Sequence, residues 1–151
     1  DGGDPPPASV LDFGCGPLGG LAEAMGPAVV PYDPYVERYR AEPWSRAPAT
    51  FFSCDVFEHL TVPQLRWLVR KVCKTASVSK VFVALSTRAA NKLLPNGLNA
   101  HLTVRPPDWW AGFFAYQLGQ AFDPAGAVYD MAAEGCVFQF VRAAPAAGGG
   151  G

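Results

Sequence analysis

The sequence predicts one α/β domain with a mostly parallel sheet, flanked by helices and closed by an antiparallel pair of strands near its C-terminal end. Three observations lead to this prediction. The chain has 151 residues, half of them hydrophobic, which is enough for a single core. Short apolar runs alternate with helical segments over short links, as they do in parallel sheets. The last two apolar runs suit a closing antiparallel pair.

The first part of the folded unit is expected to form strand, helix and strand. Residues 9–13 are a short apolar run stopped by glycine, as in a buried strand. Residues 18–25 suit a short helix, which the following Gly-Pro pair ends. Residues 28–32 predict a second strand. Because proline cannot donate to the ladder, Pro31 places this strand at an edge or at its own end.

A further strand, residues 50–54, precedes the clearest helix of the sequence. Thr61 opens this helix and has capping-box spacing with Gln64. Its apolar face consists of Leu65, Leu68, Val69 and Val72. Its basic stripe, which we interpret as a solvated helix face, consists of Arg66, Arg70, Lys71 and Lys74.

The C-terminal half is expected to complete the sheet and add one more helix. Residues 80–86 predict a strand near the centre of the sheet. Residues 106–118 predict an aromatic helix with proline in its first turn. Its neighbouring Trp109 and Trp110 cannot face one direction, so at least one is expected in the core. The closing antiparallel pair is predicted at residues 128–129 and 136–141.

Both ends of the chain are expected to lie outside this fold. Residues 1–8 are rich in proline and glycine and predict a flexible arm. Residues 144–151 end in glycines and predict a flexible tail, so the domain is expected to span residues 9–143. The sequence begins with Asp1 and not Met, which leaves room for its being part of a longer chain or assembly.

Composition excludes several classes of protein. The 13 acidic and 12 basic residues nearly cancel, so no global charge draws the domain to nucleic acid or to a membrane. The apolar runs are far shorter than the ~20 residues of a membrane-spanning helix, and no secretion signal is visible. The four cysteines form no C-x-x-C pair, so we expect no metal and reduced thiols in the cytoplasm.

A glycine-rich turn after the first strand is the first candidate binding feature. Gly14 and Gly16 allow a tight turn and a close approach to a ligand, although a packing turn would need the same residues. Asp12 places a carboxylate at the tip of the first strand, and Asp33 ends the second. Ligands of parallel sheets bind at the carboxyl ends of the strands, where a carboxylate can accept two hydrogen bonds from a ribose diol. The alternative role for Asp33 is in a turn, because Asp-Pro often starts one.

Three segments in order along the chain, VLDFGCG, PYDPY and CDVFEHL, resemble motifs of class I S-adenosylmethionine-dependent methyltransferases. CDVFEHL, residues 54–60, is the most specific and is similar to the D-V-L-E-H-L segment at the fourth strand of many members. HLTVRPPDWW, residues 101–110, is similar to sequences after the fifth strand in some members. The resemblance covers about residues 9–118. It implies a Rossmann-like fold, S-adenosylmethionine as cofactor, and methyl transfer to an oxygen or nitrogen nucleophile.

The resemblance also implies residue roles. Asp12 would lie near the amino-acid end of the cofactor, and Asp33 would hold its ribose hydroxyls. Asp55, Val56 and His59 would lie by the methionine moiety and the transferable methyl. The full set of cofactor-binding residues is then Asp12, Gly14, Cys15, Gly16, Asp33, Asp55 and Val56.

Two departures from the family pattern stand out. Leu18 occupies the usual place of the third glycine, and Gly19 follows it. Residues 34–48 are too short for the usual helix, third strand and adenine-contacting acid, so we expect the third strand to be lacking. The adenine pocket is then either built by Tyr35 or Trp44 or incomplete.

Candidate catalytic residues are the two histidines of the chain, His59 and His101, whose ordinary pKa of about 6.5 suits a general base. Structural roles are the alternative for both. Arg88, Arg105 and Trp109 are candidates for binding the substrate.

The leading hypothesis is therefore a compact methyltransferase. A small-molecule acceptor is favoured because the net charge is close to zero, while nucleic acid is not excluded. The alternative is a degenerate domain that keeps the fold and serves as a scaffold in a larger assembly. A nicotinamide-dinucleotide protein fits less well, because it leaves Asp12 and CDVFEHL unexplained.

Overall fold

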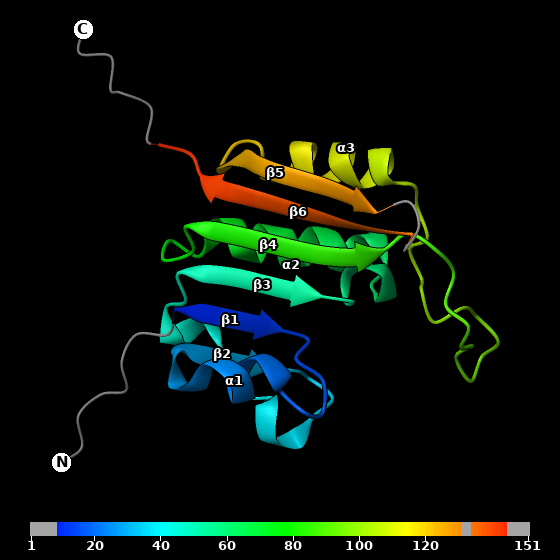
Figure 1. Ribbon diagram of the computed structural model, residues 1–151, viewed down its shortest axis with the longest axis horizontal. Helices are drawn as coiled ribbons and strands as arrows, with labels where there is room; N and C mark the ends of the chain where they lie inside the picture. Colours follow the sequence, from blue (N-terminus) through cyan, green and yellow to red (C-terminus); the bar gives the residue numbers. More distant parts are fainter. Residues whose placement is uncertain (1–8, 131–133, 145–151) are drawn as a thin grey trace, which may run out of the picture.

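Six strands form one sheet in the order β2-β1-β3-β4-β6-β5 in the computed structural model, which describes residues 9–130 and 134–144 (Figure 1). The strands are β1 (Val10–Phe13), β2 (Val29–Tyr32), β3 (Thr50–Cys54), β4 (Lys80–Ser86), β5 (Phe122–Asp130) and β6 (Gly135–Arg142). The first four are parallel, and β6 is antiparallel to both β4 and β5. The predicted mostly parallel sheet with a closing antiparallel pair is confirmed. The predicted arm at residues 1–8 and all but the first residue of the predicted tail lie outside the described residues.

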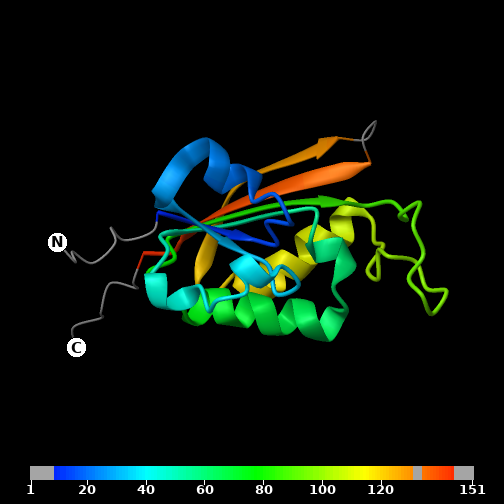
Figure 2. The same ribbon diagram turned by 90° about the horizontal axis from the view of Figure 1, so that it is seen from below.

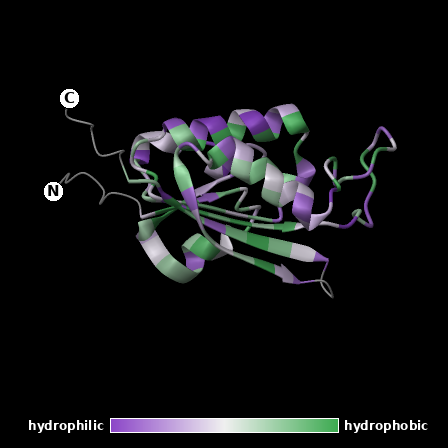
Figure 3. Cartoon of the chain, turned by 90° about the horizontal axis from the view of Figure 1, so that it is seen from above, coloured by the Kyte–Doolittle hydropathy of each residue, from purple (hydrophilic) through white to green (hydrophobic). Residues whose placement is uncertain are grey.

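Helices cover the sheet unequally. Helices α2 (Val62–Lys74) and α3 (Pro107–Leu118) lie together on one face, whereas the short α1 (Gly20–Met25) lies on the other face beside β1 and β2 (Figure 2). The core fills the space under α2 and α3, and hydrophobic colouring gathers on the strands there (Figure 3). Trp110 is fully buried in this core, as expected for one of the two adjacent tryptophans. No helix within the described ranges is long and apolar enough to cross a membrane.

Helix α2 follows the prediction closely. Thr61 and Gln64 form the capping box, and the four predicted apolar residues are the buried ones. Helix α1 begins two residues later than predicted, because Gly19 at its N-cap has a left-handed φ of 62°.

The sheet ends at β2, as Pro31 indicated. Residues 34–48 contain two short 3-10 turns, η2 (Glu37–Tyr39) and η3 (Trp44–Arg46), and no strand, so the expected lack of the third strand is confirmed. Trp44 stacks on Phe51 with their ring centroids 6.2 Å apart and belongs to the packing around the core.

Strand β5 is longer than the two residues predicted. Pro124 and Gly126 lower the strand signal of its sequence, and the pairing of β5 with β6 shifts register between them. Such residues are tolerated here because β5 is the outer strand of the sheet.

Candidate cofactor and acceptor site

A cavity with a volume of about 820 Å³ lies at the carboxyl edge of the parallel strands. Residues that follow β1, β2 and β3 line it, including Gly16, Asp33 and Val56. Its size lies within the roughly 300–1,000 Å³ of small-molecule pockets. The position agrees with the rule that ligands of open α/β sheets bind at this edge.

The glycine turn, residues 14–16, is fastened to the end of β2 by its own backbone. The amides of Gly14 and Cys15 both donate to the carbonyl oxygen of Tyr32, at 2.7 and 3.1 Å. The amide of Gly16 donates to Oδ2 of Asp33 at 3.1 Å. All three amides of the turn are therefore engaged within the protein.

Asp33 is held at the cavity wall by two backbone amides. Oδ2 accepts the amide of Gly16, and Oδ1 accepts the amide of Tyr35 at 2.9 Å. A carboxylate has about four lone-pair positions. Each oxygen of Asp33 therefore retains acceptor capacity for a ligand, and its orientation is already fixed.

Gly14 is needed where the turn meets the segment after β3. It has a φ of 82°, and a Cβ there would lie 2.3 Å from Cγ2 of Val56. At Gly16, whose φ is 65°, a Cβ would meet no atom within 4 Å, so the turn leaves open space at this position. The cavity can therefore admit a ligand beside the turn.

Asp55 lies at the wall of the cavity, directly after β3. Its φ is 54°, a left-handed conformation that Asp tolerates better than most residues. The thiol of Cys54 donates to Oδ2 of Asp55 at 3.6 Å. Burial, followed by the charge of Asp55, raises the pKa of the Cys54 thiol to about 11.

Asp12 and Cys15 lie near the cavity but do not line it. Asp12 is buried in β1, and burial raises the pKa of its carboxyl. Burial, with smaller effects from Asp12 and Asp33, raises the pKa of the Cys15 thiol to about 11. The expected roles of Asp12 and Cys15 toward a cofactor stay predictions.

Glu58, His59 and His101 form a second group of side chains, of which His59 lines the cavity. One potential ligand atom from each residue lies within 4.8 Å of the others, and the two imidazole rings are edge-to-face at 4.7 Å. Glu58 is fully buried, and its Oε1 accepts the amide of Ser86 at 2.9 Å. Its Oε2 is buried without a hydrogen-bond partner in the described chain. Burial raises the pKa of this carboxyl, although the Ser86 amide opposes the shift.

The two histidines are fixed in the tautomer that leaves Nε2 free to act as a ligand. Nδ1 of His59 lies 2.9 Å from the carbonyl oxygen of Ala100, and Nδ1 of His101 lies 2.6 Å from that of Arg88. Because a carbonyl oxygen only accepts, each Nδ1 carries the proton and each Nε2 keeps its lone pair when the ring is neutral. Metal-binding histidines are oriented in the same way. Two histidines and a carboxylate are a ligand set that divalent transition metals accept, so this group can hold a metal that the cysteine pattern did not indicate.

Residues 87–105, the loop between β4 and α3, carry His101 back to the end of β3. Asn99 fixes the path of this 87–105 loop. Its Oδ1 accepts the amides of Ala90 and His101, and its Nδ2 donates to the carbonyl oxygen of Ala90. The hydroxyl of Thr103 also donates to the carbonyl oxygen of Leu60 at 2.6 Å.

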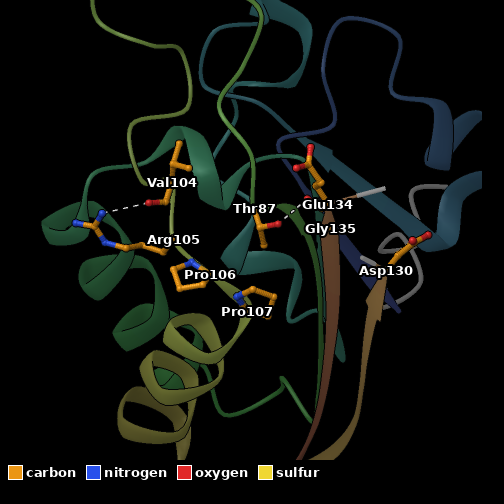
Figure 4. Close-up of a pocket in the computed structure, with 8 residues that line it drawn as sticks. All are labelled: Thr87, Val104, Arg105, Pro106, Pro107, Asp130, Glu134 and Gly135. Carbon is orange, nitrogen blue, oxygen red and sulfur yellow. Dashed lines mark hydrogen bonds between the residues drawn. The ribbon is translucent and has the colours of Figure 1, made fainter. Parts of the chain in front are cut away.

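The three predicted substrate residues lie apart from the large cavity. Arg88 contacts His101 through its backbone carbonyl. Arg105 lines a second cavity of about 410 Å³, where Thr87 and two prolines lie between it and the carboxylates of Asp130 and Glu134 (Figure 4). Trp109 lines neither cavity. It stacks on Phe113 at 5.4 Å and lies under the guanidinium of Arg105 at 5.8 Å.

Several residues of the site were not singled out as functional residues from the sequence. Glu58 is part of CDVFEHL, and a glutamate next to a histidine was a sequence signal that could have indicated a functional role. Trp67, a large aromatic outside the apolar face of α2, was another. Further lining residues that were not predicted as site residues include Gln64, Leu94, Ala100 and Leu102.

Comparison with known proteins supports the geometric interpretation at the level of fold. No family model and no curated protein matches the sequence. Among solved structures, the methyltransferase domain of bacterial CtHen1 is similar with a TM-score of 0.57 at 14% identity, covering 88% of this chain and 89% of that one. The 16S rRNA (adenine(1408)-N(1))-methyltransferase from Catenulisporales acidiphilia is similar with a TM-score of 0.60 at 11% identity, covering 92% and 87%.

The chain has the fold of the class I S-adenosylmethionine-dependent methyltransferases. The resemblance found in the three sequence motifs is confirmed at this level. At identities this low, the structural similarity establishes the architecture alone. The chemistry has to be argued from the residues of the site.

Proposed function

We propose that the chain is an S-adenosylmethionine-dependent methyltransferase that modifies an oxygen nucleophile of RNA. The observation that carries the proposal is that Gly16, Asp33 and His59 line one and the same cavity. Bound S-adenosylmethionine supplies the methyl group on a sulfonium that is already a good leaving group. The protein then has to align nucleophile and methyl group and exclude water.

The glycine turn and Asp33 suit a nucleoside without a pyrophosphate. Asp33 can accept both ribose hydroxyls, because its two oxygens are fixed and keep free lone pairs. Dinucleotide sites use free amides at this turn and a helix N-terminus to bind the pyrophosphate. Here the amides of residues 14–16 are engaged within the protein, which disfavours the nicotinamide-dinucleotide alternative.

Glu58, His59 and His101 are proposed to hold a divalent cation at the acceptor end of the cavity. The unpartnered Oε2 of Glu58 supports this, since a buried carboxylate oxygen without a partner is costly unless a cation or a hydrogen bond compensates it. A cation held by these residues would supply Lewis acidity, which would lower the pKa of an acceptor hydroxyl. This favours oxygen over nitrogen as the nucleophile. His59 and His101 are then ligands and not the general bases that the sequence suggested.

The charge of the 87–105 loop favours RNA over the small molecule first expected. The 87–105 loop contains Arg88, Lys92 and Arg105 and no acidic residue. The near-zero net charge of the chain hides this local excess of positive charge, which suits a phosphate-bearing acceptor. The similar enzyme from Catenulisporales acidiphilia is named as a 16S rRNA methyltransferase.

The scaffold alternative is favoured by one observation, the end of the sheet at β2 without a third strand. Binding of S-adenosylhomocysteine separates the two proposals. Calorimetry is expected to show binding by the wild type and a loss of about tenfold or more for Asp33→Ala, because two charge-assisted hydrogen bonds are lost. Asp123→Ala, which removes an exposed carboxylate that lines neither cavity, is the matched control. If the wild type does not bind, the methyltransferase proposal is wrong.

The cation and the acceptor are tested separately. Titration with Mn²⁺ followed by electron paramagnetic resonance is expected to show one site in the wild type and none in His101→Ala. Unchanged Mn²⁺ binding by His101→Ala would refute the cation site. Transfer of labelled methyl groups to an RNA pool is expected to stop with EDTA and return with Mn²⁺. Labelling of a small-molecule pool but not of RNA would refute the RNA acceptor and leave cofactor binding intact.

A further inference from the structure

The lack of a third strand leaves one side of the cavity without its usual wall. Residues 34–48 make two 3-10 turns, and β2 is the edge of the sheet. Family members place an adenine-contacting acid on the strand that is lacking here. If Asp33 holds the ribose, the adenine attached to that ribose lies beside Asp33, among the residues that line the same cavity.

Two large aromatic side chains line the cavity in this region. Tyr35 is 95% exposed and Trp67 is 63% exposed, yet both contribute to the wall of the same cavity as Asp33. A planar ligand that covers an exposed aromatic ring on a cavity wall removes a large apolar surface from water, and this favours binding. Neither ring has an aromatic partner within the part of the chain that the structure describes.

Tyr35 is tied directly to the candidate ribose site. Its amide donates to Oδ1 of Asp33 at 2.9 Å, so its position relative to this carboxylate is fixed by the backbone. The adjacent Pro34 lines the cavity as well. A base attached to a ribose on Asp33 therefore lies close to residues 34 and 35.

Helix α2 supplies the other wall. Gln64, Trp67 and Leu68 stand at spacings of three and four residues, so they share one face of the helix. Leu68 is buried beneath them. Oε1 of Gln64 accepts both the amide and the hydroxyl of Thr61 at 2.8 Å, which leaves the amide nitrogen of Gln64 as the donor.

We propose that Tyr35 and Trp67 bind the adenine of the cofactor by stacking, in place of the wall that the lacking strand would provide. Gln64 donates from its amide nitrogen to an acceptor nitrogen of the ring. The inference rests on the proposed function, since it assumes that Asp33 binds the ribose of S-adenosylmethionine. Trp44, the other aromatic residue expected at this pocket, is packed on Phe51 and does not line the cavity.

Calorimetry with S-adenosylhomocysteine and with adenosine tests the inference. Stacking of a base on an aromatic side chain contributes about 1–3 kcal/mol. Trp67→Ala is therefore expected to lower the affinity for both ligands by roughly tenfold or more. Trp67→Phe keeps a ring and is expected to stay within about threefold of the wild type. Tyr35→Ala is compared with Tyr116→Ala, whose ring is 84% exposed on α3 and lines neither cavity.

A spectroscopic readout separates stacking from a general loss of structure. Titration of S-adenosylhomocysteine is expected to quench tryptophan fluorescence in the wild type, and this quenching is expected to be lost in Trp67→Phe while binding persists. If the wild type binds and both alanine variants bind equally well, the adenine inference is wrong and the proposed function stands. If Trp67→Ala weakens RNA methylation without weakening adenosine, Trp67 contacts the acceptor and the inference is wrong. If the wild type binds neither ligand, the proposed function fails as well.

Discussion

Replacing Gly14 with alanine would probe the contact between the glycine turn and the segment after β3. The new Cβ would lie 2.3 Å from Cγ2 and 3.2 Å from Cγ1 of Val56, and the backbone φ of 82° would remain left-handed. A left-handed L residue costs roughly 1–2 kcal/mol, and overpacking in a filled site costs about 1–3 kcal/mol more. We therefore expect Gly14→Ala to lower the free energy of unfolding by about 2–5 kcal/mol.

Gly16→Ala is the matched control for the cost of placing alanine in a left-handed backbone conformation. Its φ is 65°, and its Cβ would meet no atom within 4 Å, so only the cost of the left-handed conformation applies. We expect a loss of about 1–2 kcal/mol. Adding Val56→Ala to Gly14→Ala removes the side chain that collides. The double variant should therefore be more stable than the sum of the two single changes predicts.

Urea denaturation followed by circular dichroism measures these free energies. Calorimetry with S-adenosylhomocysteine adds a second readout, because Val56 lines the cavity and would be pushed into it by the new Cβ. Equal losses for Gly14→Ala and Gly16→Ala, with additive effects in the double variant, would refute the close contact with Val56.

The remaining predictions concern a helix cap, a thiol and a buried carboxyl. Thr61→Ala removes the capping box of α2 and is expected to cost about 1 kcal/mol of unfolding free energy in urea. The pKa of the Cys54 thiol is about 11, so the rate of its alkylation, mapped by mass spectrometry, should rise with pH up to about pH 11. Asp55→Asn should lower this pKa and therefore speed the alkylation of Cys54 at pH 8. For Asp12, burial raises the folded-state pKa above 3.8, so the unfolded chain releases this proton first as pH rises. The stability of Asp12→Asn should therefore improve relative to the wild type as pH rises from 3 to 7, and a constant difference across this range would contradict the raised pKa.

Much of the fold was predictable because its signals are local. The capping box of Thr61 and Gln64 and the apolar face of α2 depend on residues within one helix. The proximity of the glycine turn and Asp33 could be predicted because the carboxyl ends of neighbouring parallel strands lie at one edge of the sheet. The hydrogen bond from the amide of Gly16 to Asp33 confirms that the turn and this carboxylate lie together.

The acceptor end was not predictable in the same way. His101 reaches His59 only because the 87–105 loop folds back, and Asn99 fixes this path by bonds to the loop backbone. Loop geometry of this kind has no periodic signal in a sequence. The tautomer that exposes Nε2 depends in turn on the carbonyl groups of Ala100 and Arg88, which only the folded loop brings near.

The lack of the third strand has a limited effect on the site because of where that strand would stand. Residues of the candidate site follow β1, β2, β3 and β4, which are adjacent in the sheet order. Loss of a strand outside β2 removes an edge of the sheet but leaves these four carboxyl ends in their places. Under the proposed function, the residues for the ribose and the acceptor are therefore kept, and the residues for the adenine come from other elements. The elements that we propose for this role both line the cavity: the turn after β2, which carries Tyr35, and helix α2, which carries Trp67.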